Sequence, residues 1–318
     1  KMQIRGKTRR FLLPKVRPVK LGGDGRLCRR LAAWRKACKG SIGRSFTVLA
    51  GFIPPAKAFF KNPLGHGGKR TGRKVKKLDS YIDIHSHILP EIDDGAENFE
   101  TAMEMLRTAW NDGIREIILT PHNKPSHHNA DPEKIKRLME ILQDKACGEG
   151  MDIKFYTGNE MYYGSDMTKK LEEGRALTLA GSAYVLVEFG MGEDIDHIRY
   201  GLYEALSHGY RPILAHVERY GRMLTRADRV EDFIRMGCYI QVNAGSIMGT
   251  FGFSAKQFTK KLLAQGLVHF VATDAHDMGK RKPALSDCAG YVSRKYGEGY
   301  AERLFYGNPM SVIKDEYI

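Results

Sequence analysis

From Ser80 onward, short runs rich in β-branched and aromatic residues alternate with longer amphipathic stretches. A repeat of roughly 30 to 40 residues is typical of βα units that build a parallel sheet. Seven runs have the strand pattern: residues 81–84, 116–119, 154–156, 183–189, 212–215, 239–242 and 269–272. About 240 residues organised in this way match the size of a closed α/β barrel. An open doubly wound sheet is the alternative, but no glycine-rich phosphate loop follows the first run.

The stretches between these runs carry apolar residues at helical spacing. They cover residues 102–110, 132–142, 198–207, 230–236 and 255–264. Glycines stand near the ends of several of them, where a left-handed residue stops a helix: Gly113, Gly209, Gly237 and Gly266. The sequence therefore predicts an α/β barrel whose functional groups lie at the carboxyl ends of the strands.

The positive charge is confined to the start of the chain. The formal net charge is +14, yet residues 1–78 carry +22 with a single acid, Asp24, and residues 79–318 carry −8. Residues 1–78 also lack a sustained helix or strand period. We expect them to form a basic, poorly ordered extension in front of a barrel domain at residues 79–318.

Composition disfavours disulfide-stabilised proteins and membrane-spanning proteins. The five cysteines are scattered without a paired spacing, which points to a reducing compartment, the cytoplasm by default. The longest apolar stretch, residues 46–60, is broken by Gly51 and by Pro54 and Pro55, so we expect no transmembrane helix.

A histidine or a carboxylate follows nearly every predicted strand. The motifs, in chain order, are HSH at residues 85–87 with Asp94 beyond it, TPH at 120–122, GNE at 158–160, Glu188, AHVERY at 215–220, Asn243 and TDAH at 273–276. A single histidine in such a place is as often a satisfied core residue as a ligand. Five histidines and four carboxylates at equivalent positions instead favour one shared pocket, and mixed imidazole and carboxylate donors suit Mn, Fe or Zn.

These motifs, in this order, resemble those of the PHP (polymerase and histidinol phosphatase) superfamily. The strings IDIHSHILPEIDDG, TPH, AHVERY and TDAH are similar to its capsule-operon branch, the manganese-dependent bacterial protein-tyrosine phosphatases of the CpsB/YwqE type. The resemblance covers residues 80 to about 318. A natural start near Ser80 would fit it, so residues 1–78 are expected to be either a genuine extension or upstream sequence.

The resemblance implies a distorted TIM-like (β/α)7 barrel that holds three divalent metal ions, first of all Mn, with Fe or Zn as alternatives. Matched motif by motif, the implied ligands are His85, His87, Asp94, His122, Glu160, Glu188, His216, Asp274 and His276. Glu160 would be the bridging carboxylate. Arg219 and Arg281 match the arginines on the substrate side of the family's site. Their alternatives are an ion pair of Arg219 with Glu218 or Asp228, and solvent exposure of Arg281.

The implied activity is hydrolysis of phosphotyrosine in a protein, expected to be the tail of a cognate bacterial tyrosine kinase, with control of capsule or exopolysaccharide synthesis. The proton donor to the leaving tyrosyl oxygen stays open among metal-bound water, Asp277 and His127.

Three alternatives remain. The same site could act on histidinol phosphate or another small phosphomonoester. The basic extension could bind nucleic acid, with the barrel secondary. A Cys-x5-Arg nucleophile occurs formally at residues 38–44 and 288–294, but both copies lack the histidine and glycine that shape such a phosphate loop.

Overall fold

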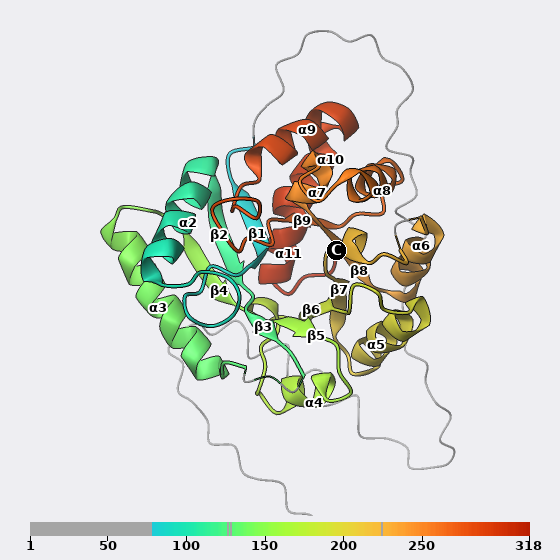
Figure 1. Cartoon of the computed structure of the whole chain (residues 1–318), viewed down its shortest axis with the longest axis horizontal. Helices are drawn as coiled ribbons and strands as arrows, with labels where there is room; N and C mark the ends of the chain where they lie inside the picture. Colours follow the sequence, from blue (N-terminus) through green and yellow to red (C-terminus); the bar gives the residue numbers. More distant parts are fainter. Residues whose placement is uncertain (1–77, 126, 128, 224) are drawn as a thin grey trace, which may run out of the picture. The chain divides into compact units, whose positions relative to one another are not determined.

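The computed structural model describes residues 78–318 apart from residues 126, 128 and 224 (Figure 1). The predicted basic extension and the Cys-x5-Arg match at residues 38–44 lie outside the described residues, except for Leu78.

Parallel strands form the centre of the described part. They are β1 (Tyr81–Ser86), β2 (Ile114–Leu119), β3 (His122–Asn123), β4 (Lys154–Thr157), β5 (Glu160–Tyr162), β6 (Tyr184–Glu188), β7 (Arg211–Leu214), β8 (Tyr239–Asn243) and β9 (Phe270–Ala272). They pair in the orders β1-β2-β4 and β3-β5-β6-β7-β8-β9, and every pair is parallel. Each of the seven predicted runs overlaps one strand; the short strands β3 and β5 were not predicted.

Backbone hydrogen bonds connect the parts of the sheet where the regular strand pairing is interrupted. Gly158 donates to the Leu119 carbonyl at 2.9 Å, and Glu160 donates to the Pro121 carbonyl at 3.2 Å. On its other side, β1 meets the segment that follows β9, because His87 donates to the Ala275 carbonyl at 2.9 Å and Ser86 forms a parallel bridge with Ala275. The sheet is therefore curled, and its first and last strands lie side by side at their carboxyl ends (Figure 1).

The α-helices are α2 (Phe99–Asp112), α3 (Pro132–Gly148), α4 (Met167–Glu172), α5 (Ile195–Ser207), α6 (Ala227–Met236), α7 (Ala244–Met248), α8 (Phe253–Ala264), α9 (Ser286–Tyr296), α10 (Glu298–Glu302) and α11 (Asn308–Ile313). Helices such as α2, α3, α5, α6 and α8 lie around the outside of the curled sheet, whereas α11 lies in the middle of it in the view of Figure 1. The five predicted helical stretches lie within α2, α3, α5, α6 and α8, which confirms them. None of the helices in the described part is long and apolar enough to cross a lipid bilayer.

Local sequence sets the ends of these helices. Asn98 accepts a hydrogen bond from the Thr101 backbone N–H at 2.9 Å and so caps α2. Asp131 caps α3 in the same way at Lys134, just before Pro132. Gly113 ends α2 with a φ of 103°, a left-handed conformation that glycine adopts without a steric penalty.

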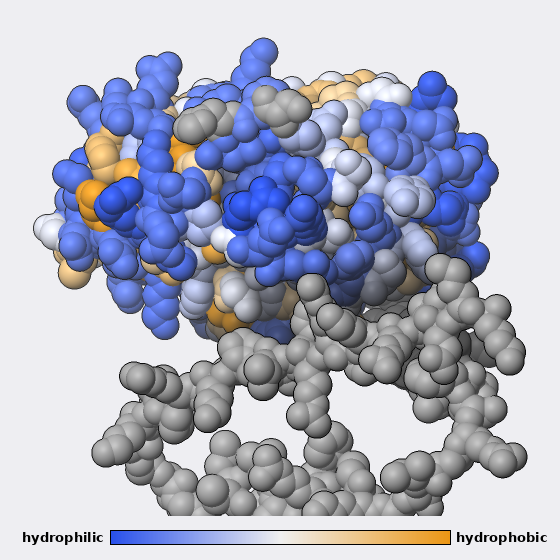
Figure 2. Space-filling model, turned by 90° about the horizontal axis from the view of Figure 1, so that it is seen from below, coloured by the Kyte–Doolittle hydropathy of each residue, from blue (hydrophilic) through white to orange (hydrophobic). Residues whose placement is uncertain are grey.

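The apolar core has two parts because side chains alternate across the strands. On β6, Val185 and Val187 belong to the larger cluster, which packs beneath the helices, whereas Leu186 belongs to a second cluster. The second cluster is built from one side of several strands, with Phe270 on β9 and Val312 on α11 among its members. On the face shown in Figure 2, hydrophilic residues predominate and hydrophobic ones form small, separate groups.

The packing of α5 gives a first prediction. A Cβ at Gly201 would lie 2.8 Å from the Tyr163 ring and 2.9 Å from the Phe189 ring, both buried. We expect Gly201→Ala to lower the free energy of unfolding by about 1 to 3 kcal/mol through overpacking. Gly299→Ala on α10 is the matched control, because nothing lies within 4 Å of its Cβ position and no positive φ is involved. Chemical unfolding of both variants checks this; equal stabilities would contradict it.

Candidate metal centre

The carboxyl edge of the curled sheet gathers the donor residues named from the sequence. β1 carries His85, β3 carries His122, and Glu160 and Glu188 begin β5 and end β6. The other members stand in the loops that follow the strands: His87, Asp94, His216, Asp274 and His276. His85, His122 and Glu160 were expected just beyond strands; they lie on strands instead, because β1 runs to Ser86 and the ladder resumes as β3 and β5.

All nine residues come together. They form four groups whose ligand atoms lie within 4.8 Å of one another: His87, Asp94, His122 and His276; His85, His87 and Glu160; His85, His216 and Asp274; and His122, Glu160 and Glu188. The groups share members, so together they make one continuous cluster.

Glu160 lies at the centre of this cluster and is fully buried. Its Oε1 atom lies 2.9 Å from His216 Nε2 and 3.3 Å from His85 Nε2. Its Oε2 atom lies 2.8 Å from His122 Nδ1 and 3.4 Å from His87 Nε2. Burial by itself would raise the pKa of Glu160, but the surrounding histidines hold that pKa well below its usual value. One carboxylate thus contacts four imidazoles.

Several donor atoms are buried without a hydrogen bond among the described residues. His122 Nδ1 and Glu160 Oε2 lie 2.8 Å apart, yet neither forms a hydrogen bond. Glu188 Oε2 and His276 Nε2 are in the same situation. An unsatisfied buried polar atom costs about 1 to 3 kcal/mol. Lone pairs that converge in this way, on nitrogen and oxygen donors, fit divalent Mn, Fe or Zn.

The carboxylates give the cluster a strongly negative potential. Burial lowers the pKa of His87, but Asp93 and Glu160 outweigh burial and raise that pKa to about 10. Burial also lowers the pKa of His216, but Glu160 and Glu188 outweigh burial and raise that pKa to about 10. The pKa of Asp94 is lowered, chiefly by His122 and His276, whose Nε2 atoms lie 3.2 Å and 3.4 Å from its Oδ1 atom. The cluster therefore favours positive charge.

Two arginines border the cluster at Asp274. Arg219, at the end of the short helix η2 (Val217–Arg219), donates from Nη1 to Asp274 Oδ2 at 3.2 Å. Arg281 donates from Nη2 to Asp274 Oδ1 at 2.6 Å and from Nε to the Asp274 carbonyl at 3.2 Å. Their side chains are 27% and 21% exposed, so both remain open to solvent. Arg219 contacts Asp274 rather than the alternative partners Glu218 and Asp228.

Asp93 is a site residue that the sequence did not single out. Its Oδ2 atom lies 2.7 Å from His87 Nδ1 and accepts a hydrogen bond from the His122 backbone N–H at 3.0 Å. Its Oδ1 atom accepts one from Gly95 at 3.0 Å. Asp93 thus orients His87 and ties the loop to β3. The adjacent aspartates were visible in the sequence, but not their different roles.

Gln241 and Asn243, on β8, also contact the cluster. Gln241 Oε1 accepts a hydrogen bond from the His216 backbone N–H at 2.8 Å, and Asn243 Nδ2 donates to Asp274 Oδ2 at 2.7 Å. Asn243 directly followed the strand predicted at residues 239–242, whereas Gln241 gave no signal other than a polar residue inside that strand.

Two members of the cluster have a strained backbone. His216 and Asp274 adopt φ values of 31° and 52°, in the left-handed region that residues with a side chain rarely enter. Such strain persists only where neighbouring contacts enforce it. Both residues follow strand ends, so the strain turns their side chains into the cluster.

The two protein groups considered as proton donors interact elsewhere. Asp277 is exposed, and its Oδ1 atom accepts hydrogen bonds from the backbone of Gly279 and Arg281. His127 is exposed, with Nδ1 lying 2.9 Å from the Pro125 carbonyl. These partners are groups of their own loops rather than members of the cluster.

The second Cys-x5-Arg match lies inside a helix. Cys288 and Arg294 both belong to α9, and a helix cannot curve around a phosphate as a loop does. Cys288 is buried, and burial, together with Asp287, raises the pKa of its thiol. A thiol held neutral in this way is a poor nucleophile.

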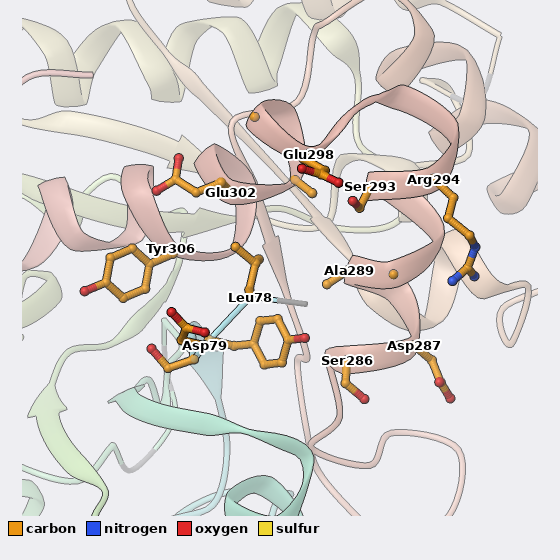
Figure 3. A pocket seen from close by; sticks show the side chains of 15 residues that line it. Leu78, Asp79, Ser286, Asp287, Ala289, Ser293, Arg294, Glu298, Glu302 and Tyr306 are labelled. Atoms are coloured by element: carbon orange, nitrogen blue, oxygen red, sulfur yellow. The ribbon is translucent and has the colours of Figure 1, made fainter. Parts of the chain in front are cut away.

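A pocket of about 770 Å³ lies at the opposite end of β1. Tyr81, the first residue of β1, lines it together with residues of α9 and α10, and the acidic side chains of Asp79, Glu298 and Glu302 surround it (Figure 3). None of the nine clustered residues lines this pocket. The candidate site is therefore the cluster at the carboxyl edge.

The fold and the cluster together define a class: an α/β protein with a curled parallel sheet and a candidate metal centre of histidines and carboxylates at its carboxyl edge. Residues 81–314 match the family described as "Capsular polysaccharide synthesis, CpsB/CapC". The chain belongs to this family, which confirms the resemblance seen in its motifs.

Similar proteins cover the same region. The tyrosine-protein phosphatase CpsB of Streptococcus pneumoniae is 35% identical over 242 residues, which are 74% of this chain and 100% of that protein. The tyrosine-protein phosphatase YwqE of Bacillus subtilis is 31% identical over 220 residues, 68% of this chain and 85% of that protein. A crystal structure from work on B. subtilis YwqE and S. pneumoniae CpsB, described as unique metal-dependent tyrosine phosphatases, aligns with a TM-score of 0.70 at 29% identity, covering 74% of this chain and 96% of that one.

Proposed function

We propose that this protein is a metal-dependent protein-tyrosine phosphatase that acts on a bacterial tyrosine kinase and so regulates capsule or exopolysaccharide synthesis. The observation that carries the proposal is the convergence of nine donor residues and two arginines on one edge of the sheet. It is supported by curated relatives named as tyrosine-protein phosphatases, one of which aligns over its whole length.

In this proposal the nine clustered residues hold three divalent ions, Mn in the first place, with Fe or Zn as alternatives. Glu160 is the shared ligand, since its two oxygens face four imidazoles. Such ions, when bound, supply a nucleophilic water at neutral pH and neutralise the charge of a phosphoryl group.

Arg219 and Arg281 are the protein's own contribution to binding the phosphoryl group. Each arginine donates a hydrogen bond to Asp274 from one part of its guanidinium and has other N–H groups that can donate to phosphoryl oxygens. Donors fixed in place before the reaction stabilise charge that develops in the transition state, because they need not reorganise. The contact with Asp274 fixes both arginines in this way.

Asp93 and the backbone orient three of the proposed ligands. Asp93 accepts from His87 Nδ1, which leaves His87 Nε2 facing Glu160. The left-handed backbone at His216 and Asp274 keeps these side chains aimed at the cluster.

We further propose that the curled sheet is a (β/α)7 barrel in which β3 and β5 continue β2 and β4. The hydrogen bonds between β1 and the segment after β9 support this. We propose a cytoplasmic enzyme with residues 79–318 as its catalytic domain and residues 1–78 as a basic extension.

Metal dependence is the first test of this function. Excess chelator should abolish phosphotyrosine hydrolysis, and added Mn²⁺ should restore it. Asp274→Ala should lower kcat/KM more than about 100-fold, because it removes a proposed ligand and the anchor of both arginines. Cys288→Ser is the control and should stay active; full activity in chelator, lost in Cys288→Ser, would refute the metal mechanism.

Substrate preference separates the two phosphatase alternatives. We expect kcat/KM for a phosphotyrosine peptide to exceed that for histidinol phosphate by at least about 10-fold, or about 1.4 kcal/mol. Steady-state kinetics on the Mn²⁺-loaded enzyme measures this. A preference for histidinol phosphate would replace the proposed substrate while leaving the metal centre intact.

Removal of residues 1–78 tests the division of the chain. The remaining segment, net charge −8, carries every residue of the cluster, so its phosphotyrosine kinetics should stay within about twofold of those of the full chain. The full chain should show no salt-dependent binding to DNA or RNA. Strong binding that disappears with residues 1–78 would favour the nucleic-acid alternative.

A further inference from the structure

We infer that Gln241 and Asn243 are positioning residues that fix the ring tautomer of His85 and the orientation of the Asp274 carboxylate. Both side chains are fully buried on β8, and neither belongs to the four donor groups. We call this pair the β8 amide relay. The inference rests on the proposed function, because it takes His85 and Asp274 as metal ligands.

One backbone group sets the direction of the whole relay. The His216 backbone N–H can only donate, and it lies 2.8 Å from Gln241 Oε1, which must therefore be the amide oxygen. Gln241 Nε2 is then a donor, and its partner at 2.8 Å is Asn243 Oδ1. This leaves Asn243 Nδ2 to donate to Asp274 Oδ2 at 2.7 Å. Each amide has only one orientation that satisfies all of its neighbours.

The relay determines which nitrogen of His85 carries the proton. His85 Nδ1 lies 3.2 Å from Gln241 Oε1, an atom that only accepts, so Nδ1 must be the protonated nitrogen. The lone pair is then on Nε2, which lies 3.3 Å from Glu160 Oε1 and 3.4 Å from Asp274 Oδ1. His85 is thus held in the tautomer that offers a ligand atom to the cluster.

At its other end the relay restrains Asp274. Oδ2 receives Asn243 Nδ2 and Arg219 Nη1, while Oδ1 receives Arg281 and faces His85. Asn243 is itself held in place, because its backbone N–H donates to the buried carboxylate of Glu218 at 2.9 Å. β8 supplies none of the nine candidate ligands, yet through these hydrogen bonds it connects His85 on the first strand with Asp274 after the last strand.

Metal affinity of the full-length chain tests the relay. Gln241→Leu and Asn243→Leu should each weaken Mn²⁺ binding about 10- to 100-fold, as loss of such supporting contacts does. Gln143→Leu is the matched control, since the Gln143 side chain donates to the Ile153 carbonyl and neither residue belongs to the cluster. It should bind Mn²⁺ like the wild type. Thermal unfolding of the metal-free variants establishes that they are folded.

A second measurement reads the tautomer directly. In ¹⁵N NMR spectra of the Zn²⁺-loaded chain, His85 should carry its proton on Nδ1. That signal should broaden or vanish in Gln241→Leu and persist in Asn243→Leu, where Gln241 remains. Gln241→Glu, of nearly the same size, keeps the acceptor toward His85 but removes the donor toward Asn243. It should retain the Nδ1 proton while Mn²⁺ affinity falls, which a general loss of packing would not produce.

The outcomes are distinguishable. A wild-type chain that binds Mn²⁺, with Gln241→Leu and Asn243→Leu binding equally well, overturns the relay alone. A His85 proton on Nε2 in the Zn²⁺-loaded chain also overturns it. A folded wild-type chain that binds no divalent metal overturns the proposed function and the positioning role together.

Discussion

The junction between the first strand and the segment after the last one is the contact on which the site depends. Asp83, on β1, is fully buried and accepts hydrogen bonds from the backbone N–H and the hydroxyl of Thr273, 190 residues away in the sequence. Burial raises the pKa of Asp83 to about 6, even though these hydrogen bonds lower it. His85 and Asp274 can share one cluster only because this junction holds the sheet curled.

The cluster concentrates charge that the rest of the protein must tolerate. Four carboxylates and five imidazoles are packed at the carboxyl edge, and several of their atoms have no hydrogen bond among the described residues. Such an arrangement is costly for folding alone, because buried polar atoms lose hydration without compensation. Strain at His216 and Asp274 adds to that cost. The cost is understandable if bound cations offset it, which is why the arrangement indicates function rather than stability.

Sequence reasoning could locate the strands and the donor motifs because both depend on local pattern. The alternation of apolar runs located β1 and β6, and each strand end displayed its own polar residue, such as Glu188. It missed β3 and β5, since strands of two and three residues leave no periodic signal. The role of Gln241 could not be predicted for a different reason. It depends on a hydrogen bond from the His216 backbone, which follows the neighbouring strand β7, and no spacing in the sequence encodes that contact.

Asp274 is where the two halves of the proposed chemistry meet. Its Oδ1 atom faces His85 and also binds Arg281, and its Oδ2 atom binds Arg219 and Asn243. The proposed metal centre and the two proposed phosphoryl-binding arginines thus both depend on the position of one carboxylate. A shift of Asp274 would move the arginines proposed to bind the phosphoryl group together with the proposed metal ligands. The buried amides of β8 and the left-handed backbone at Asp274 both act against such a shift, so they preserve the alignment between the proposed phosphoryl-binding arginines and the proposed metal centre rather than either one alone.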